Sequence, residues 1–419
     1  MTINQPGEPE HAKSGVTLTL ALAILSASLG TSIANIALPT LTAVFSAPFA
    51  QVQAVVIAYL AAMALSVVIA GRVGDRYGLK PVFIAGLVLF AIASLLCAIA
   101  PQLWSLIGAR ALQGIGAAFL MTLGMALLRQ TAGEKHVGRA MGIVGTVSAL
   151  GTALGPSVGG FLLAIAGWRS LFWIQIPLVT IVLFMAFTLL PATPLKEKAS
   201  LSGGLSLRNT TLLSNLTINA AVTAVIMTTL IVGPYYLGLG LGLKETLVGL
   251  VMAIGPAVAT FSGIPSGRLV DTWGFRRALT AGLSLVVTGT FMLAILPNLL
   301  GVTGYILAII VLTPGYQLFQ AANNTATLAE APGNQRGTVS GLLNLSRNIG
   351  LIAGASIMGQ VFALGVGTED FIHAAPTSLA HGMQLTFFLA GGMVLAALVF
   401  TRLPSWAARA HSAKSQGKR

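Results

Sequence analysis

The chain has 419 residues, of which 55% are hydrophobic and only 8% charged, and its mean hydropathy is +0.88. Soluble domains carry about 25% charged residues, so this composition excludes an ordinary soluble domain. The net charge is +13, but the positive residues lie in short loops between apolar runs, which indicates membrane orientation rather than a nucleic-acid partner. A single cysteine, Cys97, excludes a disulfide framework.

Apolar runs long enough to cross a bilayer recur along the chain. A membrane helix needs about 20 predominantly apolar residues, and twelve runs of near that length can be placed. We therefore predict an all-α, polytopic membrane protein with twelve transmembrane helices. The predicted spans cover residues 16–38, 52–70, 80–100, 103–127, 138–163, 171–191, 212–237, 246–266, 276–296, 302–328, 337–363 and 380–402.

Lysine and arginine are distributed unequally between the two sets of loops. Two of the 23, Arg110 and Arg347, fall within predicted spans. Nineteen others lie in the tails or in the loops after spans 2, 4, 6, 8 and 10, whereas Arg169 and Lys244 lie on the opposite side. Positive residues are retained in the cytoplasm, so both termini are expected there, and a plasma membrane, the bacterial inner membrane, is the expected location.

Two stretches share one pattern of glycine, aspartate and basic residues. GRVGDRYGLKP begins at Gly71, and GRLVDTWGFRR begins 196 residues later at Gly267, each after the second span of a six-span half. Other glycines repeat at an offset of 199, as Gly151 and Gly350 do. Parallel repeats of this kind predict two pseudo-symmetric six-helix bundles with a substrate site between them.

Polar segments mark the expected domain boundaries. The stretch TPLKEKASLSGGLSLRN is the long polar linker between the predicted halves, and both ends of the chain are polar. The predicted domains are an N-terminal cytoplasmic tail (1–15), an N-terminal six-helix bundle (16–191), a cytoplasmic linker (192–211), a C-terminal six-helix bundle (212–402) and a C-terminal cytoplasmic tail (403–419).

The stretch that begins at Gly71 is similar to the loop signature of the major facilitator superfamily, and the one at Gly267 resembles a decayed copy of it. Gly78 permits a positive φ in a tight turn, and Asp75 is expected just before the third span, where a helix N-terminus favours negative charge. These charges predict a latch that ties the two halves together in one state and releases them in the other, with a well-capped turn as the alternative. The predicted latch comprises Gly71, Asp75, Arg76, Gly78, Lys80, Asp271 and Arg276.

The fifth predicted span contains glycines at four-residue spacing, followed by a proline. Such spacing permits close helix packing, and Pro156 removes a backbone hydrogen bond. The stretch resembles the span 5 signature of superfamily exporters that exchange substrate for protons, although helix packing alone would also explain it. The packing motif comprises Gly151, Gly155, Pro156 and Gly159.

Three further stretches resemble the drug:proton antiporter branch of the superfamily. They are LGTSIANIALPTL from Leu29, LIGARALQGIGAA from Leu106 and LNLSRNIG from Leu343. Many members of that branch have fourteen spans, whereas twelve are predicted here. Members also commonly have an aspartate where this chain has Gly30, and none of the ten acidic residues falls within a predicted span. The proton carrier therefore cannot be identified among buried carboxylates.

Two positive charges remain within the predicted spans. Intramembrane arginines are normally paired or face water. Arg110 is expected to have either a structural role or a coupling role, and Arg347 is expected near mid-membrane, in a substrate contact or a gating contact. An arginine-bearing cavity without carboxylates favours neutral or anionic amphipathic compounds over lipophilic cations. The predicted coupling and cavity residues are Arg110, Gln113, Asn35, Arg347, Asn344, Gln320 and Asn324.

The predicted function is secondary active transport by alternating access, with proton-coupled efflux of drugs or metabolites. The alternative is import or export of an organic anion, sugar or siderophore, with coupling that does not use a buried carboxylate. Asp75, Glu134, His381 or the substrate itself would then carry the proton. No nucleophile–base pair, phosphate-binding loop or metal motif is visible, so neither an enzyme nor a cofactor is predicted. The expected partners are a small-molecule substrate, protons and the lipid bilayer, and the expected state is a monomer.

Overall fold

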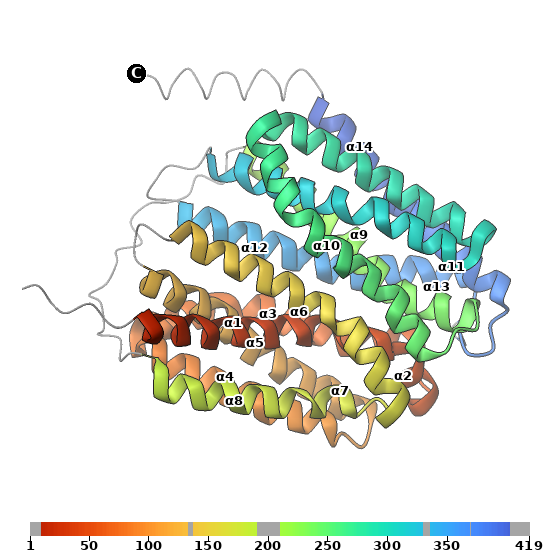
Figure 1. Cartoon of the computed structure of the whole chain (residues 1–419). Helices are drawn as coiled ribbons and strands as arrows, with labels where there is room; N and C mark the ends of the chain where they lie inside the picture. The colour runs from red at the N-terminus through yellow and green to blue at the C-terminus, as the bar shows by residue number, and fades with distance from the viewer. Residues whose placement is uncertain (1–9, 133–136, 191–209, 330–335, 369, 403–419) are drawn as a thin grey trace, which may run out of the picture. The chain divides into compact units, whose positions relative to one another are not determined.

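The computed structural model describes residues 10–132, 137–190, 210–329, 336–368 and 370–402 (Figure 1), and these ranges contain helices and turns but no strand. The elements are α1 (Glu10–Ser32), η1 (Asn35–Ala37), α2 (Leu38–Phe45), α3 (Phe49–Tyr77), α4 (Leu79–Ala98), α5 (Leu103–Ala132), α6 (Val137–Ala166), α7 (Ser170–Trp173), α8 (Gln175–Leu189), α9 (Thr210–Tyr235), η3 (Tyr236–Gly240), α10 (Glu245–Trp273), α11 (Phe275–Ala329), α12 (Arg336–Ala353), η5 (Gly354–Met358), α13 (Gly359–Val366) and α14 (Pro376–Arg402). The predicted all-α class is confirmed.

Ten helices of the described residues are long and apolar enough to cross a membrane. One of them, α11, has 55 residues, or about 80 Å at 1.5 Å per residue, against a hydrocarbon core of about 30 Å. Gly301 interrupts it with φ 57° and ψ −132°, so α11 contains two predicted spans joined at a sharp turn. A shorter apolar run, Leu150–Ala166, lies in α6. These observations are consistent with twelve spans.

The first predicted span is not one continuous helix. The helix α1 ends at Ser32, and the 3₁₀ turn η1 and the short helix α2 complete the span. Pro39 accounts for the break, because proline lacks a backbone N–H and its ring clashes with the carbonyl four residues earlier, that of Asn35. The predicted span 16–38 therefore lies within the longer apolar stretch Gly15–Phe45, whose helix is broken.

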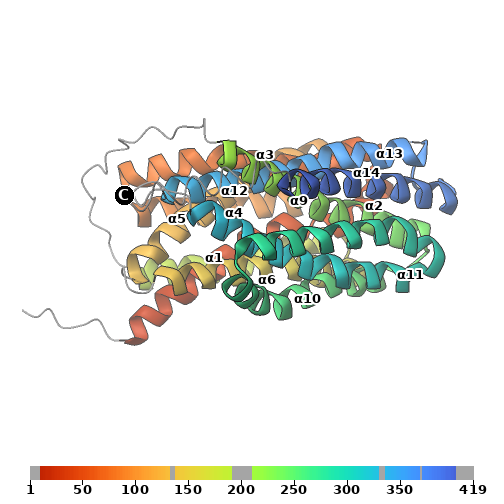
Figure 2. The ribbon, with the colours of Figure 1, turned by 90° about the horizontal axis from the view of Figure 1, so that it is seen from above.

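The described helices pack into two compact units. Unit 1 comprises Met1–Ala34, Ala58–Gly155 and Ile165–Ala199, and unit 2 comprises Asn35–Ile57, Pro156–Ala164 and Ser200–Arg419. The helices α3 and α6 are each divided between the two units. Within unit 2, α9 packs along α12 (Figure 2) and also contacts α11 and α14. Within unit 1, α5 packs against both α1 and α4.

Repeated glycines make equivalent contacts inside each unit. A Cβ atom placed on Gly151 of α6 would lie 2.7 Å from the backbone oxygen of Leu25 in α1. A Cβ atom placed on Gly350 of α12 would collide with the backbone oxygen of Ala220 in α9. In both cases the fifth span of a half packs, through glycine, against the first span of the same half. The pseudo-symmetry predicted from the sequence is therefore present in the packing.

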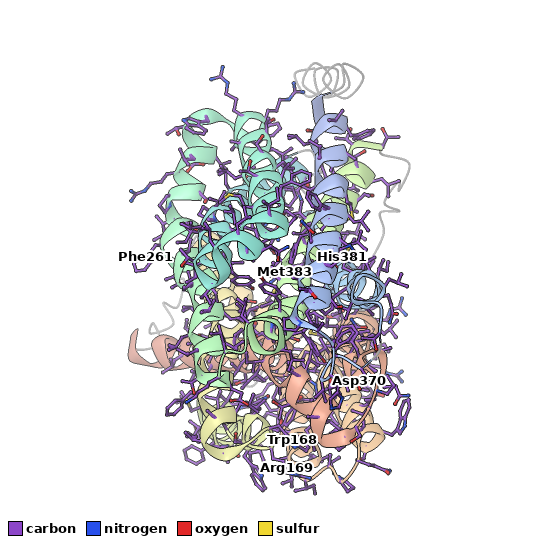
Figure 3. The ribbon with its side chains drawn as sticks, turned by 90° about the vertical axis from the view of Figure 1, so that its right-hand side faces the viewer. Trp168, Arg169, Phe261, Asp370, His381 and Met383 are labelled. Carbon is purple, nitrogen blue, oxygen red and sulfur yellow. The ribbon has the colours of Figure 1, made fainter. Side chains whose placement is uncertain are left out.

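Large apolar side chains are exposed along the long helices. Phe261 of α10, labelled in Figure 3, is 81% exposed, and Leu65 of α3 and Leu364 of α13 are 76% and 77% exposed. A soluble protein rarely leaves so many large apolar side chains in water, whereas a bilayer provides an apolar solvent for them.

Candidate functional site

Arg110 lies at the centre of a fully paired polar network in unit 1. Its side chain is 0% exposed. One guanidinium nitrogen donates to the backbone oxygen of Gly30 at 2.9 Å, and the other donates to Gln113 Oε1 at 2.5 Å. The guanidinium also lies 4.2 Å from the centroid of the Tyr59 ring and 5.9 Å from that of Phe172. Neutral oxygens and aromatic faces therefore stabilise this buried cation.

Gln113 extends the network to two further helices. Its Nε2 donates to Ser94 Oγ of α4 at 2.8 Å and to Gln175 Oε1 of α8 at 3.1 Å. Gln175 in turn donates from Nε2 to the backbone oxygen of Leu171 at 3.0 Å. Arg110 and Gln113, both among the predicted coupling and cavity residues, thus hydrogen-bond to each other, and their network ties α1, α4, α5 and α8 together.

The hydroxyl group of Tyr59 lies against the position that the Cβ atom of an aspartate at residue 30 would take. A Cβ atom placed on Gly30 would lie 2.8 Å from the Tyr59 hydroxyl oxygen. That hydroxyl donates to the backbone oxygen of Ala27 at 2.6 Å. The phenol and the Gly30 carbonyl thus lie beside Arg110, at the position where the sequence resemblance leads us to expect an aspartate.

Arg347 has different surroundings in unit 2. It is part-exposed on α12, and its Nε is a buried atom without a hydrogen-bond partner. The neighbouring residue, Ser346, is 6% exposed and donates from Oγ to the backbone oxygen of Leu216 in α9 at 2.5 Å. Asn219 of α9 donates from Nδ2 to Ser346 Oγ at 3.2 Å and to the Leu343 oxygen at 3.1 Å.

The other predicted cavity residues differ in burial. Asn35 is 0% exposed in the turn η1, and neither end of its amide has a hydrogen-bond partner. Gln320 is part-buried and donates from Nε2 to the Tyr316 hydroxyl at 2.8 Å, whereas Asn324 is exposed. Asn344 is part-exposed, near Arg347 on α12. Arg110 belongs to unit 1 and Arg347 to unit 2.

The predicted latch residues lie at helix ends, and their role stays a prediction. Asp75 is exposed in the last turn of α3 rather than at the N-terminus of α4. The argument that a helix N-terminus stabilises its charge was therefore wrong. Gly78 does adopt the predicted positive φ, 92°, and its repeat Gly274 has φ 78°. Lys80 donates from Nζ to the Phe187 oxygen at 3.3 Å and to the Leu190 oxygen. Both oxygens lie at the C-terminal end of α8, where the helix dipole stabilises a positive charge.

The remaining latch residues surround the turn between α3 and α4 and the equivalent turn between α10 and α11. Arg76 is exposed in the last turn of α3, with its guanidinium 5.3 Å from the centroid of the Tyr77 ring. Asp271 is exposed near the end of α10, and Arg276 is part-exposed at the start of α11. Gly71 of α3 has room for a Cβ atom, with Thr122 of α5 nearest at 4.0 Å.

The predicted packing motif of the fifth span makes close contacts. The helix α6 continues through Pro156, and a Cβ atom placed on Gly155 would collide with Ser32 Oγ of α1. Gly159 is buried in α6. Its neighbour Gly160 approaches Gly249 of α10, where a Cβ atom on Gly160 would lie 2.7 Å from the Cα atom.

An aromatic cluster in unit 2 had no signal in the sequence. Phe49, Tyr235, Phe362 and Phe371 are each 1% exposed or less, and their ring centroids lie 4.9 to 6.3 Å apart. Thr42 Oγ1 lies 2.9 Å from the Tyr235 hydroxyl, so the segment Asn35–Ile57 is held against α9. The five residues come from two predicted spans and two loops, and no periodicity within one helix could have related them.

Among the described residues before α14, His373 and Asp370 pair with each other. His373 Nδ1 and Asp370 Oδ2 form an exposed pair at 2.7 Å, and this hydrogen bond holds the pKa of Asp370 below its ordinary value. His381, seen on α14 in Figure 3, lies 2.8 Å through Nδ1 from the Gly365 oxygen. No group of three metal-ligating side chains is present in the ranges that the structure describes.

Arg169 lies in the turn between α6 and α7 and is held there by Trp168 and Ala100. The structure places Trp168 and Arg169 between α6 and α7 (Figure 3), with the guanidinium 4.4 Å from the centroid of the Trp168 ring. One guanidinium nitrogen donates to the Ala100 oxygen, at the end of α4, at 3.1 Å. This arginine therefore stabilises the turn. Glu134, a candidate proton carrier, lies outside the described residues.

The glycine contacts within each unit and the exposed apolar faces of the long helices describe a helical membrane protein. The family model described as Major Facilitator Superfamily matches residues 20–355. The chain belongs to the major facilitator superfamily. It is therefore a multi-pass integral membrane protein and a secondary transporter, and the superfamily is one of transporters rather than of enzymes.

Two relatives and a solved structure resemble the chain over different shares of its length. It is 25% identical to the riboflavin transporter RibZ of Clostridioides difficile, with 92% of this chain and 96% of that protein covered. It is 35% identical to the methylenomycin A resistance protein of Bacillus subtilis over 43% of this chain and 39% of that protein. The fold resembles the crystal structure of a D-xylose-proton symporter, with a TM-score of 0.78, 16% identity and coverage of 93% and 97% of the two chains.

Proposed function

We propose that this superfamily member exports small amphipathic organic compounds in exchange for protons. The observation that carries the direction of transport is the span 5 motif, whose Gly151 and Gly155 press α6 against α1 while Pro156 interrupts its hydrogen-bonding pattern. A helix with these features can shift along a neighbour without large side chains in the way. The resemblance of the motif to the exporter signature, and the name of the methylenomycin A resistance protein, support export.

Alternating access requires two gates that open in turn. We assign one gate to the aromatic cluster of Phe49, Tyr235, Phe362 and Phe371, whose rings pack against one another. The other gate is the charge latch around Asp75 and its repeat Asp271. Neither carboxylate has an ion-pair partner among the described residues. The latch side is assigned to the cytoplasm, together with both termini, because the positive residues gather there.

The route of the proton differs from that of relatives with an aspartate in the first span. Gly30 offers only its carbonyl to Arg110, and the Tyr59 hydroxyl fills the adjacent space. A substrate that brings its own proton would remove the need for a buried carboxylate. This observation favours the second candidate function, transport of an organic anion, sugar or siderophore with coupling that does not use such a group.

Direction and coupling are tested in one experiment. The purified full-length chain is reconstituted into proteoliposomes, and a proton gradient of either sign is imposed. We expect substrate to move against the proton flow, with acidification of the compartment that it leaves. Substrate movement in the same direction as protons would contradict export by antiport and support the second candidate.

A further inference from the structure

Buried polar atoms without a hydrogen-bond partner are confined to unit 2 among the described residues. Unit 1 buries comparable groups, but there Arg110, Gln113 and Tyr59 all take part in hydrogen bonds. An unpaired buried polar group is costly, so such groups mark a place where a ligand or an ordered water binds. The side chains are Asn35, Asn215, Asn219, Thr223, Gln320, Asn323 and Arg347.

Three of these side chains form one stripe on α9. Asn215, Asn219 and Thr223 recur every four residues, so they share a helix face. Asn215 and Asn219 are 1% and 2% exposed, and Thr223 is 0% exposed. The opposite side of α9 lines a groove toward α14. Its lining includes Ser214, Thr217 and Ala221. The asparagine stripe is therefore turned into the bundle rather than toward lipid.

Arg347 belongs to the α12 face that packs on this stripe. The hydrogen bonds from Asn219 to Leu343 and Ser346 fix the register of the two helices. One turn further, Gly350 makes the close approach to α9. At about 100° per residue, Arg347 lies about 40° from Leu343 and about 60° from Gly350, at the edge of this face of α12. Its Nε is buried without a partner, while the side chain as a whole stays part-exposed and can be reached.

The helix α11 adds two more amides at a similar depth. It packs against both α9 and α12. Asn323 is 1% exposed and neither end of its amide is paired, and Gln320 Oε1 is unpaired although its Nε2 donates to Tyr316. Gln320 lies nine residues before the end of α11 and Asn219 nine residues after the start of α9, each about 14 Å from its helix end at 1.5 Å per residue.

Together, the helices α9, α11 and α12 carry positive residues but no negative ones. The sequences of α9, α11 and α12 contain no acidic residue. The acidic residues that the structure describes in unit 2 are Glu245, Asp271 and Asp370, and all three are exposed in α10 or in the loop before α14. A guanidinium in such surroundings binds carboxylates in preference to ammonium groups, because its planar fork matches the two carboxylate oxygens.

We propose that α9, α11 and α12 form the anion-recognising part of the substrate site. The guanidinium of Arg347 binds the carboxylate of an amphipathic organic acid, and the amides of Asn215 and Asn323 bind polar groups beside it. This inference rests on the proposed transport function and names its substrate class. It assigns recognition to Arg347 alone of the two intramembrane arginines, since the hydrogen-bonding groups around Arg110 are already engaged with one another.

A matched series of ligands tests the charge preference. The probes are naphthalene-2-carboxylate, naphthalene-2-carboxamide and naphthalen-2-ylmethyl-trimethylammonium, which share one apolar body. Their binding to the purified full-length chain in lipid nanodiscs is measured by calorimetry. We expect the carboxylate to bind about tenfold or more tightly than the carboxamide, and the ammonium compound to bind most weakly. A carboxylate that binds no more tightly than the carboxamide, absence of all binding included, overturns the proposal.

Variants then locate the site. Arg347→Gln should weaken carboxylate binding about tenfold and change carboxamide binding by less than about twofold, and Arg347→Lys should retain an intermediate affinity. Lys244→Gln, which removes an exposed positive charge from the same unit, is the matched control and should change neither. If Arg347→Gln fails to fold, Asn215→Ala serves instead, because that amide makes no hydrogen bond in the fold. Unchanged carboxylate binding in the folded variant means that only water occupies these groups, and it overturns the proposal.

The direction of transport separates this inference from the proposed function. In proteoliposomes, selective movement of the carboxylate in the same direction as protons would overturn export by antiport and leave the anion site standing. Antiport of all three probes at equal rates would overturn the anion site and leave export by antiport standing. The two conclusions can therefore fail independently.

Discussion

Arg110 and Arg347 both lie within apolar helices, yet their surroundings differ. Arg110 is completely buried and its hydrogen-bonding groups are matched by Gly30, Gln113 and two aromatic rings. Arg347 is part-exposed, and its buried Nε has no partner. A buried charge that is fully paired contributes to a rigid bundle, whereas one with unused hydrogen-bonding capacity can bind something else. The same residue type therefore serves structure in one unit and, as we propose, recognition in the other.

The largest expected effect separates the two arginines by stability. Arg110→Ala leaves Gln113 and the Gly30 carbonyl unpaired in a buried site, so we expect a loss of about 3 to 5 kcal/mol and a low folded yield. Arg347→Ala should change the free energy of unfolding by less than about 1 kcal/mol, because its Nε makes no hydrogen bond. Thermal unfolding of the ligand-free purified variants, followed by size-exclusion chromatography, measures both. Equal losses would remove the distinction between the two sites.

A second comparison concerns the glycines that hold each bundle together. Gly350→Ala places a methyl group against the backbone oxygen of Ala220, which no side-chain change can relieve. Gly155→Ala instead collides first with the Ser32 hydroxyl. Both should cost about 1 to 3 kcal/mol, but Ser32→Gly should recover part of the loss only for Gly155→Ala. Unfolding midpoints of the single and double variants provide the measurement, and Ser32→Gly alone is the control. If Ser32→Gly also restored the stability of Gly350→Ala, the two glycine contacts described above would be wrong.

Restoring a carboxylate beside Arg110 tests how closely the unit 1 network is packed. In Gly30→Asp, the new Cβ atom would meet the Tyr59 hydroxyl at 2.8 Å. We expect a destabilisation of about 1 to 2 kcal/mol, part of which is recovered by adding Tyr59→Phe, since this removes the obstructing oxygen. The unfolding midpoints of both variants and of Tyr59→Phe alone give the answer. A stable single variant would mean that Tyr59 moves aside easily and that the network is not rigid.

Two asparagines of α9 allow a smaller comparison within unit 2. Asn219→Ala removes hydrogen bonds to Leu343 and Ser346, and it should cost about 1 kcal/mol. Asn215→Ala, one turn away, removes no hydrogen bond and should be neutral or slightly stabilising within about 0.5 kcal/mol. Ligand-free unfolding of the two variants in the same lipid nanodiscs provides the test. A larger loss for Asn215→Ala would show that its amide is paired inside the bundle and is not available to a ligand.

The smallest effect is expected at Asp370, outside both regions. The hydrogen bond from His373 depresses the pKa of this carboxyl below its ordinary 3.8 in the folded state. A depressed pKa contributes stability above the unfolded value, and the contribution is lost only as pH falls below 3.8 toward the folded value. Asp370→Asn should therefore leave the pH profile of unfolding and transport unchanged between about pH 5 and 8. A changed profile in that window would make this exposed pair a participant in coupling.

The sequence alone determined much of the fold. Apolar runs located the helices because a bilayer requires about 20 apolar residues for each crossing and forbids unpaired backbone within it. The repeat of Gly151 at Gly350 was visible because close helix packing demands glycine at fixed positions. Gly78 was correctly predicted to have a positive φ, since its turn is short.

Tertiary structure alone decided the site. Arg110 and Arg347 look alike in sequence, and only packing shows that Tyr59, Gln113 and Gly30 surround the first while the second is left with an unpaired nitrogen. The aromatic cluster also joins residues far apart along the chain. Local periodicity describes one helix at a time, whereas the pairing of a buried polar atom depends on which helices meet and at what depth. That information exists only once the helices are packed.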